Sequence, residues 1–69
     1  MTKMRLETLR VRDGLSREAV ARRINISAMT VRNWERGDTE PTASQIKALA
    51  NLFKVSTDYL LGFTKEKNI

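Results

Sequence analysis

Helix start and stop signals recur at short intervals along this sequence, and they limit its regular structure to brief helices. Four residues that tolerate the left-handed backbone conformation, at which helices end, are spread through the chain: Gly14, Asn25, Gly37 and Gly62. Four side chains with oxygens that cap a helix start stand ahead of apolar segments: Ser16, Ser27, Thr42 and Ser56. Thr42 is followed three residues later by Gln45, which is the pattern of a capping box. The signals predict five short helices.

Apolar residues within these segments repeat at helical spacing, so each helix has one face for a common core. The inward positions that the spacing predicts are Leu6, Leu9, Val20, Ala21, Ile24, Val31, Trp34, Ile46, Leu49, Ala50, Phe53 and Leu60. No alternation typical of a strand lasts more than a few residues. The expected fold class is all-α: a compact five-helix domain over residues 1–62, followed by a short charged tail over residues 63–69.

The amino-acid composition excludes several classes of function. The 69 residues contain no cysteine and no histidine, which excludes a thiolate or imidazole metal site, a disulfide framework and a histidine-activated nucleophile. The acidic residues are spread over helix starts and surface positions rather than paired. We therefore expect no catalytic residues, no metal and no cofactor, and the chain is not predicted to be an enzyme. No apolar run approaches the ~20 residues of a membrane span, so no membrane partner is expected and the cytoplasm is the expected location.

Positive charge is concentrated in the first half of the chain. Residues 1–37 hold nine lysine or arginine residues against four acidic ones, whereas residues 38–69 hold four of each sign. Eight of the nine basic residues are arginine, whose forked guanidinium suits phosphate groups and guanine. This distribution favours a nucleic-acid partner. A solvated basic surface without a partner is the alternative that charge alone leaves open.

Residues 17–36, REAVARRINISAMTVRNWER, have the pattern of two short helices joined by a tight bend. Ala21 is small where the two helices are expected to cross, and Asn25 stands where the bend needs a positive φ. The wedge between the helices is predicted to contain Val20, Ile24, Ile26, Val31 and Trp34. The spacing indicates a helix-turn-helix, although the same steric demands apply to a corner between two helices of any bundle.

One face of the second of these helices carries an unusual mixture of side chains. Opposite Val31 and Trp34, small apolar, flexible apolar, amide and guanidinium groups stand together: Ala28, Met29, Arg32, Asn33 and Arg36. Such a face is neither a second core stripe nor the charged face of a solvated helix. It indicates a surface that contacts a partner.

The sequence resembles the phage-repressor and Cro-type helix-turn-helix family, also called the XRE family of bacterial and phage transcriptional regulators. The resemblance is carried by LETLRVRDGLSREAVARRINIS, VRNWERGDTEP and ALANLFKVSTDYLLG, and it covers roughly residues 4–62. It implies a lambda-repressor-like DNA-binding fold and a homodimer that reads a palindromic operator in double-stranded DNA. Because the chain ends soon after the fifth helix, it also implies a Cro-like or minimal repressor, associated with the nucleoid in the cytoplasm.

The resemblance assigns roles to single residues, because in this fold the N-terminal part of the third helix enters the major groove. It implies base contacts by Arg17, Ala28, Met29, Arg32 and Asn33, and phosphate contacts by Ser27, Arg36 and Thr39. An amide pairs with adenine, a guanidinium forks onto guanine or holds a phosphate, and small apolar groups meet thymine methyls. For Met29 and Arg36 the plainer alternatives are an exposed spacer and a solvated charge. The family often has glutamine where this chain has Arg17, and polar residues where it has Ala28 and Met29.

Two further sets of residues are expected to support this surface. Arg10 and Glu35 occupy positions that resemble an ion pair of the family, which links the first helix to the end of the third. Two independent surface charges are the alternative. The dimer interface is expected at Tyr59, Leu61 and Phe63. The alternative for these three residues is that they close the base of the core.

Two classes of function remain open. The first is a sequence-specific DNA-binding transcriptional regulator. The second is a protein-binding module of the same fold, such as an antirepressor, a modulator of a repressor or an antitoxin, which the apolar Ala28 and Met29 favour. Salt dependence distinguishes the two, because the logarithm of DNA affinity falls against the logarithm of salt with a slope of about −0.9 per phosphate neutralised.

Overall fold

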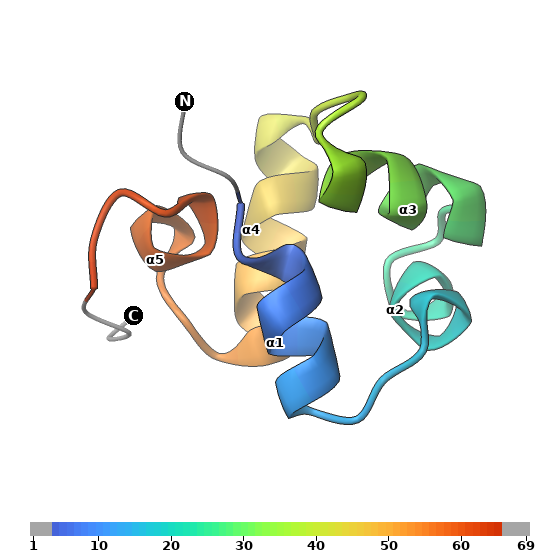
Figure 1. Ribbon diagram of the computed structural model, residues 1–69, viewed down its shortest axis with the longest axis horizontal. Coiled ribbons are helices and arrows are strands. Elements are labelled where there is room, and N and C mark those ends of the chain that lie inside the picture. The colour runs from blue at the N-terminus through green and yellow to red at the C-terminus, as the bar shows by residue number, and fades with distance from the viewer. Residues whose placement is uncertain (1–3, 66–69) are drawn as a thin grey trace.

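The computed structural model describes residues 4–65, which form five α-helices and no strand. In chain order the helices are α1 (Leu6–Arg12), α2 (Arg17–Arg23), α3 (Ala28–Arg36), α4 (Ala43–Phe53) and α5 (Thr57–Leu61). Figure 1 shows α2 and α3 at one end of the molecule and α5 at the other, with α1 and α4 between them. The expectation of an all-α, five-helix fold is confirmed. Residues 1–3 of the expected domain and residues 66–69 of the expected tail lie outside the described residues.

All four predicted helix caps are formed. The helices α2 to α5 begin directly after Ser16, Ser27, Thr42 and Ser56, whose side chains each accept a hydrogen bond from the backbone N–H three residues on. At α4 the capping box is complete: the Thr42 N–H donates to Gln45 Oε1 over 2.8 Å, and the Gln45 N–H donates to Thr42 Oγ1 over 3.3 Å. Because these bonds satisfy N–H groups that have no partner inside the helix, they fix where each helix starts.

The predicted left-handed positions are also confirmed, and the structure adds one more. Asn25 has φ +60° in the bend between α2 and α3, and the three predicted glycines have positive φ values as well. Lys54 ends α4 with φ +58°, although lysine has no special tolerance of this conformation. The next residue, Val55, is buried in the core, and its N–H donates to Ala50 O over 3.0 Å. These two contacts hold Lys54 in the turn, in the manner of a helix C-terminal motif.

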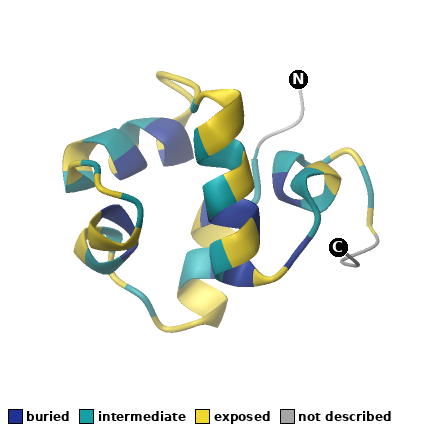
Figure 2. Cartoon of the chain, turned by 180° about the vertical axis from the view of Figure 1, so that it is seen from behind, coloured by how far each residue is buried: buried dark blue, intermediate teal, exposed yellow. Residues whose placement is uncertain are grey.

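The core lies where the five helices meet, and the buried faces of the helices turn toward the middle of the molecule (Figure 2). Its buried apolar residues are Leu6, Leu9, Val20, Ala21, Val31, Trp34, Leu49, Ala50, Phe53, Val55 and Leu60. Ile24, Ile26 and Ile46 pack against this set but are only half-buried, because they stand at its edge. Helical spacing does not predict Val55, because this residue lies in the link between α4 and α5.

Two arginines of the basic first half bind backbone carbonyl groups near the ends of α4 and α5. The Arg5 guanidinium lies 4.2 Å from the centre of the Tyr59 ring, and it donates to the backbone oxygens of Tyr59 and Thr64. The Arg12 guanidinium donates to Phe53 O over 3.0 Å at the end of α4. Carbonyl groups at a helix C-terminus have no partner within the helix, so a cationic donor there is favourable. Part of the positive charge in the first half is therefore structural.

Replacing Asn25 tests the bend between α2 and α3. We expect Asn25→Ala to be less stable than Asn25→Gly by about 1 kcal/mol, because alanine carries the steric cost of the left-handed conformation and glycine does not. Urea denaturation followed by far-UV circular dichroism measures both variants. Equal unfolding midpoints would contradict the need for a positive φ at this position.

Candidate functional site

The helices α2 and α3 pack against each other and form one end of the molecule (Figure 1). The name α2–α3 surface is used here for the residues predicted to contact DNA: Arg17, Ser27, Ala28, Met29, Arg32, Asn33, Arg36 and Thr39. The inner face of α3 is closed, because Val31 and Trp34 are buried in the core. The outer face is therefore the part of α3 that is free to meet a partner.

The outer face of α3 combines apolar and cationic groups. Met29 is 58% exposed, and the Arg32 Nη1 atom lies 3.7 Å from its sulfur. Ala28 and Asn33 are half-buried beside them. Exposed apolar side chains are common singly, and Val11 on α1 is 63% exposed as well, so it is the grouping of Met29 with Arg32 that makes this face a candidate for contact with a partner.

The residues predicted to hold phosphates lie at the two ends of α3. Ser27 Oγ accepts the N–H of Thr30 over 3.1 Å as the cap of α3, and it lies 2.9 Å from the Thr30 hydroxyl. At the other end, Nε of Arg36, the last residue of α3, lies 3.3 Å from Asp38 Oδ2, and both side chains are more than half exposed. Thr39 is exposed in the same turn. An exposed ion pair contributes about 0–1 kcal/mol, so Arg36 remains available to an anion.

A buried carboxylate joins three helices beneath this surface. The Glu35 side chain on α3 is 2% exposed, and it is held by Arg10 of α1 and Arg17 of α2. Arg10 donates from Nε to Oε2 over 2.6 Å and from Nη2 to Oε1 over 3.4 Å, while Arg17 donates from Nε to Oε1 over 2.9 Å. Arg10 Nη1 also donates to Leu15 O over 2.9 Å in the link between α1 and α2. The three charged groups thus fix α1, α2 and α3 relative to one another.

Arg17 belongs both to this buried cluster and to the α2–α3 surface. The structure brings Arg10 and Glu35 together as expected, and it adds Arg17, for which the expected contact is with a base or a phosphate. Arg17 and Glu35 stand 18 positions apart on different helices, so no local pattern in the sequence reveals their contact. The paired Arg17 side chain is still 39% exposed.

A hollow of about 340 Å³ lies between the start of α2 and the start of α3. Its lining combines three guanidinium side chains with two apolar side chains, one hydroxyl and one carboxylate: Arg10, Arg17, Arg32, Ala28, Met29, Ser16 and Glu18. Four of the five residues predicted to contact bases therefore surround a single hollow. Asn33, the fifth, lies outside this lining.

The residues predicted to form a dimer interface lie at the opposite end of the molecule, on α5 and in the turn after it (Figure 1). Phe63 is 71% exposed, whereas Tyr59 and Leu61 are half-buried. Tyr59 packs against the core and lies beneath the Arg5 guanidinium. Closing the base of the core is thus a role that suits Tyr59 but not Phe63.

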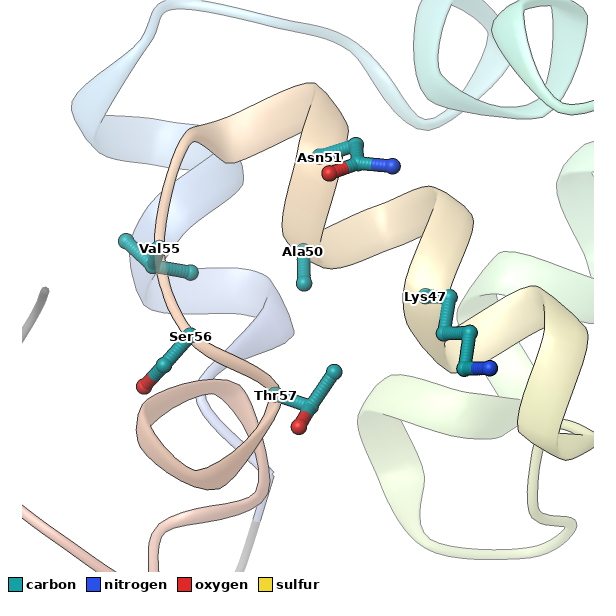
Figure 3. Close-up of a pocket in the computed structure, with 6 residues that line it drawn as sticks. All are labelled: Lys47, Ala50, Asn51, Val55, Ser56 and Thr57. Carbon is teal, nitrogen blue, oxygen red and sulfur yellow. The ribbon is translucent and has the colours of Figure 1, made fainter. Parts of the chain in front are cut away.

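A second hollow, of about 330 Å³, lies between α4 and α5 and contains none of the predicted site residues. Its lining, drawn in Figure 3, consists of Lys47, Ala50, Asn51, Val55, Ser56 and Thr57. Lys47 is the single charged residue of this lining, and the Ser56 oxygen is occupied as the cap of α5. Because no set of charged groups converges there, the α2–α3 surface is the stronger candidate.

The described residues offer neither a metal site nor a membrane segment. No group of acidic side chains among residues 4–65 is arranged to hold a metal ion. None of the described helices is both long enough and apolar enough to cross a bilayer.

Comparisons with known proteins agree with the observed helix order. The family described as helix-turn-helix matches residues 6–60. The HTH-type transcriptional regulator ImmR of Bacillus subtilis is 38% identical over 58 residues, which are 84% of this chain and 46% of ImmR. The repressor protein C2 of Salmonella phage P22 is 30% identical over 66 residues, which are 94% of this chain and 31% of that protein. The chain therefore spans less than half the length of these relatives.

Two solved structures share the five-helix fold. The P22 c2 repressor protein, crystallised in complex with a synthetic operator, gives a TM-score of 0.81 at 28% identity over 87% of this chain and 91% of that chain. A transcriptional regulator from Listeria innocua gives a TM-score of 0.80 at 31% identity over 88% of this chain and 57% of that chain.

Breaking the buried ion pair tests its role in holding the helices. We expect Arg10→Met to lower the free energy of unfolding by about 3 kcal/mol, the low end of the cost of stranding a buried charge, because Arg17 remains beside Glu35. The matched double variant, Arg10→Met with Glu35→Leu, removes both charges and should keep most of the parent stability. Chemical denaturation compares the three proteins. Parent-like stability of Arg10→Met alone would show that the pair does not hold the helices.

Proposed function

The chain belongs to the helix-turn-helix family of XRE and phage-repressor type, and on that premise we propose that it is a sequence-specific transcriptional regulator that binds double-stranded DNA. The observation that carries the proposal is the α2–α3 surface, where the guanidinium groups of the half-buried Arg17 and the exposed Arg32 line a hollow between the starts of two packed helices. The P22 c2 repressor, which was crystallised with a synthetic operator and shares this fold, supports DNA as the partner.

In this proposal α3 lies in the major groove with its N-terminal half toward the base edges. Asn33 pairs with adenine, and Arg17 and Arg32 fork onto guanine. Ala28 and Met29 supply apolar contact with thymine methyl groups. The exposure of Met29 and its position beside Arg32 support this division of roles.

Phosphate contacts set the register of α3 on the duplex. Ser27 stands at the start of α3, where backbone N–H groups without helical partners favour an anion. Arg36, the last residue of α3, and Thr39, in the turn that follows, hold phosphates at the other end. The exposed pair between Arg36 and Asp38 opens at little cost when a phosphate replaces the carboxylate.

We further propose that the regulator reads a palindromic operator as a homodimer. One chain presents a single short reading helix, and a two-fold pair reads half-sites about 34–36 Å apart on one face of the duplex. Tyr59, Leu61 and Phe63 form the interface, for which the exposed Phe63 is the main support. Because such a patch is small, pairing takes place mainly on DNA. Residues 1–62 form the DNA-binding domain, residues 63–69 a charged tail, and the protein acts at the nucleoid in the cytoplasm.

A second candidate function is binding to another regulatory protein, which the exposed side chain of Met29 favours. The two functions differ in their dependence on salt. Binding to DNA through several phosphates weakens steeply as salt rises, whereas an apolar contact through Ala28 and Met29 does not.

Removing the reading side chains tests the function. We expect Arg32→Ala and Asn33→Ala each to weaken binding to the duplex selected from a random pool by about 1–3 kcal/mol and to relax the base preference at one position. Lys47→Ala is the matched control, since it removes one positive charge from α4, away from the α2–α3 surface. Titration of labelled duplexes measures the affinities. If both reading variants bind selected and random duplexes as the parent does, α3 is not the reader.

The stoichiometry on DNA tests the homodimer. We expect two chains per selected duplex at saturation, and we expect Phe63→Ser to reduce the cooperativity of binding without unfolding the domain, because this side chain is exposed. Analytical ultracentrifugation counts the chains, and thermal melting checks the fold. One chain per duplex with full affinity would exclude the homodimer.

A further inference from the structure

We propose that Glu35 is a positioning residue for DNA binding: it holds Arg17 by Nε and so presents the two outer nitrogens of that guanidinium to the DNA. The proposal rests on the proposed function and extends it to a residue that does not reach the DNA itself. The Glu35 side chain is 2% exposed, so any effect that it has on binding passes through another group.

The two arginines at Glu35 are used to different extents. Arg10 is fully engaged, since Nε and Nη2 donate to the carboxylate and Nη1 donates to Leu15 O. Arg17 donates from Nε alone, and no other hydrogen bond or ion pair engages it within residues 4–65. The exposed fractions of the two side chains follow the same order, 13% for Arg10 and 39% for Arg17. The carboxylate therefore anchors Arg17 and leaves its outer nitrogens free.

The free end of Arg17 has a defined chemistry. Nη1 and Nη2 carry parallel N–H donors that match two neighbouring acceptors, such as O6 and N7 of guanine or two oxygens of a phosphodiester. Arg17 lines the hollow between the starts of α2 and α3, next to Met29 and Arg32. The outer nitrogens of Arg17 therefore lie on the α2–α3 surface, which is the proposed DNA-binding surface.

Anchoring and charge both favour binding. A long side chain that is free in solution loses rotamer freedom when it contacts a ligand, and holding it beforehand raises affinity by roughly threefold to tenfold. The Glu35 carboxylate also lies between two guanidinium groups that would otherwise repel each other across the buried site. Without it, Arg17 would move away from Arg10 and from the hollow.

The other arginines of the α2–α3 surface have no such anchor. Arg32 approaches only the sulfur of the exposed Met29, and Arg36 pairs with the exposed Asp38. Among the described residues of this surface, Arg17 is the one held by a buried carboxylate. The structure therefore singles out Arg17 as the residue whose contribution to binding depends on Glu35.

A double-mutant cycle tests this dependence. Arg17→Ala is measured in the parent and in the Arg10→Met, Glu35→Leu background, with affinity for the selected duplex as the readout and thermal melting as the check of folding. We expect Arg17→Ala to weaken binding at least tenfold in the parent. In the Arg10→Met, Glu35→Leu background the loss in affinity should be smaller, by a factor of roughly three to ten. The matched control is Arg22→Ala, which removes the same charge from α2 at a residue with no contact to Glu35, and its effect should be equal in both. Equal losses from Arg17→Ala in both would overturn the proposal.

A second measurement uses the unmodified protein and does not depend on folding of the background variant. In the free chain, the Nε–H of Arg17 should give a resolved, slowly exchanging signal in nitrogen–proton correlation spectra, and Arg17→Ala should remove that signal. A signal averaged to the position of free arginine would show that Glu35 does not hold Arg17, and would overturn the proposal.

Salt titration identifies the acceptor that the fork takes. If the Arg17 fork contacts a phosphate, Arg17→Ala reduces the magnitude of the slope of log affinity against log salt concentration by about 0.9. If the fork contacts guanine, the slope is unchanged and the preference for one base is relaxed. Either result, together with the coupling, supports the proposal. If the parent binds the selected duplex but the double-mutant cycle shows no coupling between Arg17 and Glu35, this inference is overturned and the proposed function is retained. If the parent binds no selected duplex, both are overturned.

Discussion

The arrangement of the first three helices depends on one carboxylate that the fold removes from water. A buried charge is costly unless cations and hydrogen bonds surround it, and Glu35 obtains both from Arg10 and Arg17. Because the two arginines stand on different helices, the need to satisfy one group sets the positions of α1 and α2 against α3. A 69-residue chain without cysteine or histidine has neither disulfides nor a thiolate or imidazole metal site for this purpose. The ion cluster and the apolar core together orient the first three helices.

Most of the fold could be predicted from the sequence, because its boundaries are set by interactions within a few residues. The serine and threonine caps, the capping box and the bend at Asn25 are local, so their patterns in the sequence correspond directly to the structure. The turn at Lys54 could not be predicted in this way. Its backbone conformation follows from the burial of Val55, which is a property of the assembled core and not of the lysine.

The site could be predicted only in part. The mixed outer face of α3 follows from helical spacing, and the resemblance to repressors supplies the candidate contacts. The internal use of arginine does not follow from the sequence, because Arg5, Arg12 and Arg17 look alike in a count of charges. Arg5 meets the Tyr59 ring and the carbonyls of Tyr59 and Thr64, Arg12 meets Asp13 and a carbonyl of α4, and Arg17 meets a buried carboxylate of α3. Only the contacts between the packed helices show which cations stabilise the domain and which are free to bind a ligand.

The contact of Arg5 with the turn after α5 has a consequence for the order of events during synthesis. Its guanidinium donates to Thr64 O, 59 positions further along the chain, and its N–H donates to Leu60 O over 2.8 Å. On the ribosome these acceptors are made after α1 to α4, so the N-terminal segment is synthesised well before its partners near α5. The pairing of α2 with α3 is local and does not wait for them. The join between the N-terminal segment and α5 can therefore form only after residue 64 has been made, whereas the contacts between α2 and α3 use residues that are made earlier.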